Sequence, residues 1–154
     1  MNMKTIGATK KFDRKDYSNW IKSVAIEGSE NLKQAKAHVP VLKELLGILT
    51  TNCGQHHPEL ICIREKFNIL SEELLLLVKK EGVFSARQSK GITLDELNFI
   101  KALLRDIRLL TNSYSLSAEN CPTYPIAYER LQNFDRQLST YLIWRVSNFS
   151  DKLF

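Results

Sequence analysis

The residues with the strongest metal-binding chemistry lie close together in the chain: Cys53, His56, His57 and Cys62. Thiolate and imidazole groups are the ligands that zinc prefers in proteins. Structural zinc sites usually join two ligand pairs across a longer loop, whereas these four residues share one local stretch. Cys62 would also lie inside a helix that starts near Pro58. We therefore expect no metal site, and a polar turn beside which the cysteines pack as small apolar groups.

Basic residues form a second group with possible chemistry. Lys101, Arg105 and Arg108 recur at a spacing that places them on one side of a helix. The first 22 residues carry an excess of four positive charges, to which Lys10 and Lys11 contribute, whereas the remaining 132 residues carry an excess of one. A row of cations on a helix is most often a solvated face. Together with the basic N-terminal segment, however, it predicts an alternative function, nucleic-acid binding through phosphate contacts.

Residues for acid–base or nucleophilic catalysis are sparse. The sequence has three histidines and contains no glycine-rich phosphate loop, no nucleophile elbow and no paired-histidine metal helix. His38 falls near an apolar helical stripe, so we expect it to be a partly buried packing residue. The adjacent carboxylates Glu72 and Glu73 would point about 100° apart on a helix and would not form a preformed pair. The sequence predicts a protein that is not an enzyme and that needs no cofactor.

The elements that must position these residues are helical almost throughout. Of the 154 residues, 44% are hydrophobic and 25% are charged, which is typical of one globular domain. No segment shows the alternation of a strand, and the longest apolar run, 74–78, is far too short to span a membrane. Three cysteines are too few for a disulfide scaffold. We expect an all-α protein in the cytoplasm, without membrane insertion.

The apolar spacing predicts a single-domain antiparallel helical bundle of about five helices over residues 13–154, preceded by a flexible basic N-terminal arm at 1–12. The expected helices are 13–26, 29 to about 50, 58–81, 93 to about 112, and 124–149, with breaks near 28, 54, 86 and 118. Gly28 is the expected end of the first helix, and Thr93 followed by Glu96 predicts a capping box at the start of the fourth. In the second, the register continues past Pro40, which favours one kinked helix over two short ones.

The third helix should be central, because apolar residues cover more than half of its circumference, and we expect Leu70, Leu74 and Leu77 to be buried. Other large apolar residues lie off the inward stripes of their helices: Leu109 and Phe99 in the fourth, Ile143 and Trp144 in the fifth. Trp144 could instead pack on the first helix. Apolar surface beyond one core predicts tighter wrapping, self-association or a docking surface.

The main functional hypothesis from the sequence is therefore a non-enzymatic protein–protein interaction module. An adaptor, a regulator and a secretion-type chaperone are the kinds of protein that fit. The expected partner is another protein or a second copy of the chain in a homodimer, bound through Trp144, Ile143, Leu109 and Phe99. The alternative is a helical nucleic-acid-binding regulator that uses Lys10, Lys11, Lys101, Arg105 and Arg108.

Overall fold

The computed structural model describes residues 14–84, 91–113 and 121–152, with side chains described for 29–81, 91–112 and 121–147. Within these residues the chain is all-helical and contains no strand. The helices are α2 (Arg14–Cys53), α3 (Pro58–Phe84), α4 (Leu94–Ser113) and α5 (Thr123–Lys152). The predicted arm at 1–12 and the predicted breaks near 86 and 118 lie outside the described residues.

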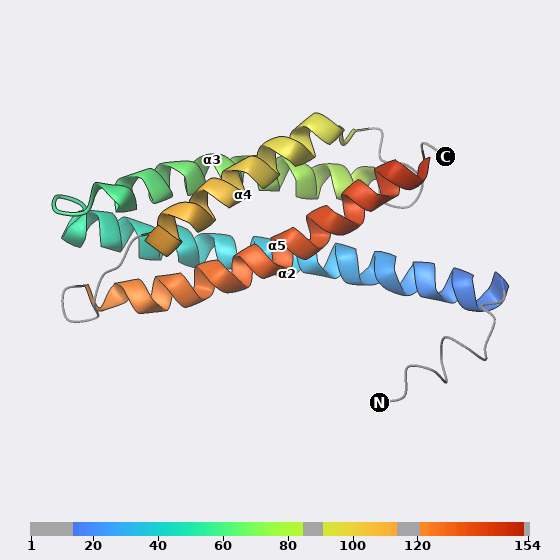
Figure 1. The fold of residues 1–154 in the computed structure, drawn as a ribbon, viewed down its shortest axis with the longest axis horizontal. Helices are drawn as coiled ribbons and strands as arrows, with labels where there is room; N and C mark the ends of the chain where they lie inside the picture. Colours follow the sequence, from blue (N-terminus) through green and yellow to red (C-terminus); the bar gives the residue numbers. More distant parts are fainter. Residues whose placement is uncertain (1–13, 85–90, 114–120, 153–154) are drawn as a thin grey trace, which may run out of the picture.

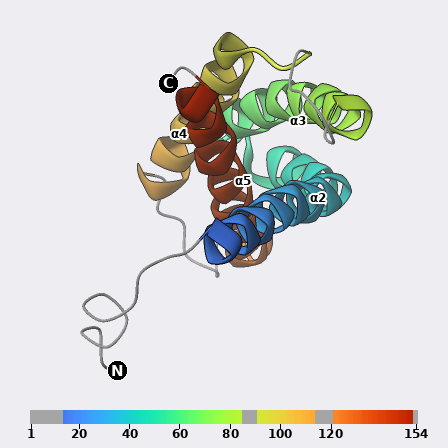
Figure 2. The same cartoon turned by 90° about the vertical axis from the view of Figure 1, so that its right-hand side faces the viewer.

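The four helices run up, down, up and down, so that each is antiparallel to the next (Figure 1). In the view along the bundle they form a ring in which α2 contacts α3, α3 contacts α4, α4 contacts α5, and α5 returns to α2 (Figure 2). The α2–α5 interface is the most extensive of the four. The N-terminal part of α2 extends beyond the other three helices (Figure 1).

The prediction of five helices was wrong for the described residues, because the expected first and second helices are one continuous helix of 40 residues. Gly28 does not end it. A glycine inside a helix costs only about 1 kcal/mol relative to alanine, so it terminates a helix only where the flanking sequence also favours an end. The residues that follow Gly28 directly, Ser29 and Glu30, include no proline, and the helix continues through them.

Pro40 likewise lies inside α2, as the continuous register predicted. Proline removes the hydrogen bond to the carbonyl four residues earlier, which disfavours a helix interior. Here the apolar stripe is buried on both sides of it, with Val39 and Leu42 in the core. Packing of this stripe against the bundle outweighs the local defect.

The ends of α2 and α4 show the local signals that the sequence predicted. The amide of Gly54 donates to the carbonyl of Thr50 at 3.0 Å, and a Cβ on residue 54 would overlap that oxygen, so the turn requires glycine. At the start of α4, the Glu96 amide donates to Thr93 Oγ1 at 3.1 Å and the Thr93 amide donates to Glu96 Oε1 at 3.1 Å. This is the predicted reciprocal capping box.

The core runs along the bundle axis and receives one face of each helix. Leu70, Leu74 and Leu77 are fully buried, as predicted. The prediction that this helix is central was wrong, because α3 has only α2 and α4 as direct neighbours among the described helices and leaves its off-stripe residues Ile69, Leu75 and Leu76 about half-exposed. At mid-bundle, the rings of Phe67 in α3 and Phe134 in α5 meet edge to face with centroids 5.3 Å apart. These two helices lie diagonally across the ring, so their contact fills its centre.

Candidate functional site

The seam between α4 and α5 is the least extensive of the four helix–helix interfaces in the described part of the chain. It is hollowed at two places. A cavity of about 380 Å³ lies between the C-terminal half of α4 and the N-terminal half of α5. A groove of about 680 Å³ occupies the rest of the seam, and we call it the α4–α5 groove. Both hollows are lined in part by Leu104 and Arg108.

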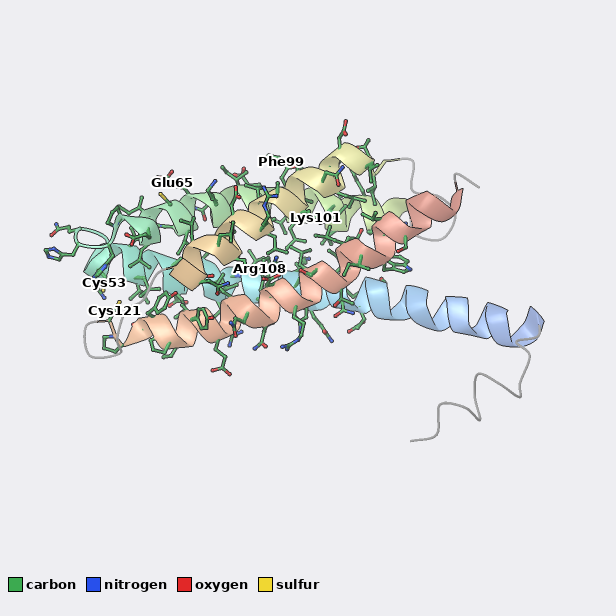
Figure 3. All side chains as sticks on the ribbon, in the orientation of Figure 1. Cys53, Glu65, Phe99, Lys101, Arg108 and Cys121 are labelled. Carbon is green, nitrogen blue, oxygen red and sulfur yellow. The ribbon has the colours of Figure 1, made fainter. Side chains whose placement is uncertain are left out.

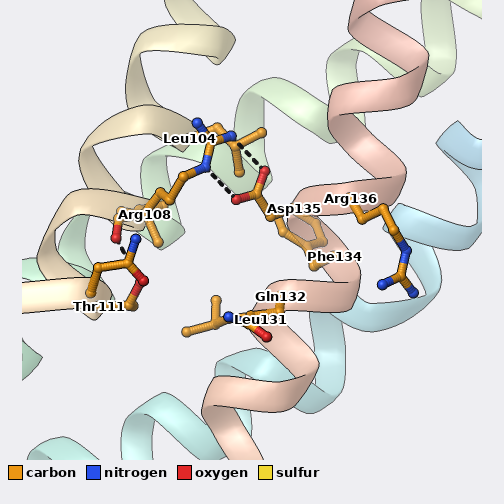
Figure 4. Close-up of a pocket in the computed structure, with 10 residues that line it drawn as sticks. Leu104, Arg108, Thr111, Leu131, Gln132, Phe134, Asp135 and Arg136 are labelled. Atoms are coloured by element: carbon orange, nitrogen blue, oxygen red, sulfur yellow. Dashed lines mark hydrogen bonds and ion pairs between the residues drawn. The ribbon is translucent and has the colours of Figure 1, made fainter. Parts of the chain in front are cut away.

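An ion pair crosses the seam where the two hollows meet. Arg108 donates from Nε to one oxygen of Asp135 at 2.6 Å and from Nη2 to the other at 2.7 Å (Figure 4). The hydroxyl of Ser139 donates to the same carboxylate at 2.8 Å. The hydrogen bonds from Arg108 to Asp135 raise the pKa of Arg108 further. Arg108 is therefore a charge-compensated bridge between α4 and α5.

The α4–α5 groove has an apolar floor and two chemically different walls. Leu97, Leu104 and Leu142 belong to the buried core and form part of its lining. The α5 wall carries Ile143, of which 69% is exposed, the largest exposed fraction of any large apolar side chain in the described residues. The groove is lined by Leu97, Asn98, Lys101, Ala102, Leu104, Arg105, Arg108, Ser139, Leu142, Ile143, Val146 and Ser147.

The α4 wall brings together the three cations that the sequence placed in one row. Lys101, Arg105 and Arg108 all line the groove, and Figure 3 shows Lys101 and Arg108 on the side of α4 that faces α5. Arg105 is exposed, and its nearest carboxylate among the described residues is that of its neighbour Asp106 at 3.9 Å. No ion pair to Lys101 occurs within the described side chains. Two of the three cations are thus available to a ligand.

The four predicted partner-binding residues do not form one surface. Ile143 lines the groove, whereas Phe99 lies on the opposite flank of α4, because the ion pairs Lys80–Glu96 and Lys66–Asp106 identify that flank as the one facing α3. Phe99 is about half-exposed. Leu109 lies on the outer face of α4, one turn beyond Arg105, and is also exposed.

Trp144 lies on a different flank of α5 from Ile143 and is half-buried against the core. Its ring stacks on the guanidinium of Arg145, with 4.4 Å between Cζ and the ring centroid. Arg145 is 6% exposed and donates from Nε to Glu81 Oε2 at 2.8 Å and from Nη2 to the same oxygen. Tyr141 also donates to this oxygen, and burial and the carboxylate raise its pKa. These contacts hold the C-terminal half of α5 onto α3.

The helical spacing of the sequence is enough to place Arg145 within the inward stripe of α5. It did not reveal that the partner of Arg145 is Glu81. Glu81 offered a signal: it follows Leu74 and Leu77 on the buried face of α3, a position that an acidic residue occupies only when it is paired. The two residues are 64 positions apart, so only the fold shows that they meet.

The cysteines and histidines near the α2–α3 turn do not converge. Cys62 is exposed on α3, whereas Cys53 is buried beside Cys121 at the end of the bundle (Figure 3). Burial and this contact raise the pKa of Cys121 to about 11. No group of three or more His, Cys, Asp or Glu residues within the described ranges is arranged to hold a metal ion.

His38 is half-buried on α2, as predicted, and its Nδ1 lies 3.2 Å from Arg130 Nη1 of α5. Burial and the charge of Arg130 lower its pKa. These contacts help to join α2 to α5. They place no nucleophile or second acid–base group beside the imidazole among the described side chains.

In comparisons with known proteins, no family model, curated protein or solved structure matches the chain. None of the helices in the described residues has the length and apolar character needed to cross a membrane.

Proposed function

We propose that the chain is a non-enzymatic protein–protein interaction module, as expected of an adaptor, a regulator or a secretion-type chaperone, and that it binds its partner in the α4–α5 groove. The observation that carries this proposal is the placement of Ile143, 69% exposed, beside the half-buried Val146 in a groove between two helices. Grooves between two helices bind the apolar face of a third helix. From Leu97 to Arg108 the groove extends about 16 Å along α4, or about three helical turns.

The proposal assigns different tasks to the residues that the sequence grouped together. Ile143 contacts the partner directly, and Leu109 lies just past the groove, where a longer partner helix would reach it. Trp144 supports α5 from inside through Arg145. Phe99 lies on a separate surface, on the flank of α4 that faces α3. The antiparallel register set by the Lys80–Glu96 pair brings it level with Leu76, which is 50% exposed.

Affinity capture from the native cell with three forms of the chain tests the proposal. The wild type is compared with Ile143→Ser and with the control Ile126→Ser, which alters an exposed isoleucine on α5 outside the groove. A partner protein should be retained by the wild type and by Ile126→Ser and lost with Ile143→Ser. Equal capture by all three forms would refute the groove as the binding site.

The same samples test the alternative functions. Treatment with nuclease before elution shows whether the captured protein is held through nucleic acid. Capture that nuclease abolishes would favour the nucleic-acid-binding regulator, with Lys101 and Arg105 as the available cations of the groove. Light scattering of the purified chain measures self-association. A dimer that dissociates on Ile143→Ser would identify a second copy as the occupant of the groove.

A further inference from the structure

The charge on the walls of the α4–α5 groove is one-sided. Among its lining residues, three are cationic and none is acidic, and all three cations belong to α4. The α5 wall is neutral and consists of Ser139, Leu142, Ile143, Val146 and Ser147. Asp135, which compensates Arg108, lines the smaller cavity and not the groove. A ligand in the groove would therefore meet apolar surface below, positive charge on one side and neutral surface on the other.

We propose that the partner segment is an acidic amphipathic helix whose carboxylates face Lys101 and Arg105. This inference rests on the proposed function and specifies the partner's chemistry. The apolar stripe of the partner covers Ile143 and the half-buried Val146, while its acidic flank lies along α4. Complementary charge of this kind fixes the orientation of the bound helix and speeds its association.

The spacing of the cations sets the pattern of acids in the partner. Lys101, Arg105 and Arg108 occupy successive turns of α4 and span about 10 Å along its axis. A helix lying roughly parallel to α4 presents residues i, i+4 and i+7 at the same intervals. Because Asp135 already compensates Arg108, the two acids opposite Lys101 and Arg105 contribute most to binding.

Charge also argues against other occupants of the groove. The N-terminal 22 residues of the chain carry an excess of four positive charges, so they would be repelled by the cations of α4. A nucleic-acid backbone would gain contacts with the exposed cations Lys101 and Arg105 but would cover the apolar side chain of Ile143 with phosphate or sugar. An acidic amphipathic helix satisfies both the apolar and the charged parts of the groove.

The test is a selection from a displayed library of helical peptides of about 16 residues, which covers the three turns of the groove. Every peptide has one apolar stripe, and the two flanks are randomised among Glu, Gln, Lys and Ser. Peptides are selected on the wild-type chain and counter-selected on Ile143→Ser, so that only groove-dependent binders remain. Selected peptides are then measured by fluorescence anisotropy against the wild type, the double charge reversal Lys101→Glu/Arg105→Glu, and the control Lys36→Glu on α2.

The proposal predicts that groove-dependent peptides carry glutamate on one flank only. The double charge reversal should weaken them at least about tenfold, Lys36→Glu should not, and raising salt from about 50 to 300 mM should weaken binding to the wild type. Groove-dependent peptides with neutral or basic flanks would overturn the acidic partner and leave the proposed function standing. A selection that yields no groove-dependent peptide would overturn both. Circular dichroism of every variant confirms that it is folded before its affinity is compared.

Discussion

Replacing Arg145 with methionine should destabilise the bundle strongly, although Arg145 is a charged residue near the end of the last helix. Its guanidinium makes two hydrogen bonds to Glu81 Oε2 inside the protein, where Glu81 is only 8% exposed. Without Arg145, the carboxylate keeps the donor from Tyr141 and loses its positive partner. A buried charge left without its counter-ion is much more costly than a lost surface ion pair.

The expected size of the effect follows from these contacts. Hydrogen bonds to a charged group contribute about 1.5–3 kcal/mol each, so the two from Arg145 correspond to roughly 3–6 kcal/mol. Breaking a buried ion pair from one side costs about 3–5 kcal/mol in other proteins. Domains of this size unfold with about 5–15 kcal/mol, so Arg145→Met should remove a large part of the total stability.

Urea unfolding followed by circular dichroism measures the change as a shift of the midpoint. Glu81→Leu alone should also destabilise strongly, because it leaves the arginine unpaired. The double variant Glu81→Leu/Arg145→Met should recover most of the loss, because it removes both charges together, and should stay about 1–3 kcal/mol below the wild type, because the buried Tyr141 hydroxyl loses its acceptor. Arg136→Met, on an exposed face of α5, should stay within about 0.5 kcal/mol. A loss below about 1 kcal/mol for Arg145→Met, or additive losses in the double variant, would refute the reasoning.

Three further predictions concern the core, a helix start and pH. Leu74→Ala should cost about 2–5 kcal/mol in the same urea assay, because Leu74 is fully buried. Thr93→Ala should cost about 0.5–2 kcal/mol by removing the cap of α4, and Thr93→Ser should recover most of it. Burial raises the pKa of Tyr124 to about 12, and it also raises the pKa of Tyr141. Since both phenols ionise near pH 10 once unfolded, the free energy of unfolding should fall above about pH 10, as measured by urea melts and by phenolate absorbance.

The parts of the fold that depend on local sequence could be predicted, and those that depend on distant contacts could not. The capping box at Thr93 and Glu96 and the turn at Gly54 involve neighbouring residues, and both are present. The break expected at Gly28 is absent, because a local preference of about 1 kcal/mol does not decide the length of a helix that packs over a long face.

The candidate site shows the same division. Helical spacing was enough to place Lys101, Arg105 and Arg108 on one side of α4. It could not show that Arg108 pairs with Asp135, 27 residues away, or that Ile143 and Phe99 lie on opposite sides of α4. A helical wheel gives the direction of each side chain relative to its own axis, and which neighbour lies in that direction is set by the tertiary fold.

The ring order of the helices has a consequence for the synthesis of the chain. The most extensive interface joins α2 to α5, the first and last helices described, and α5 begins only at Thr123. While the ribosome is still producing the last part of the chain, the face of α2 that contacts α5 has no native cover, and α4 lacks one neighbour. Native packing can therefore be completed only after the α5 segment has emerged. We therefore expect cellular quality control to recognise the exposed apolar face of nascent chains that stop before α5, even though α2, α3 and α4 have already been synthesised.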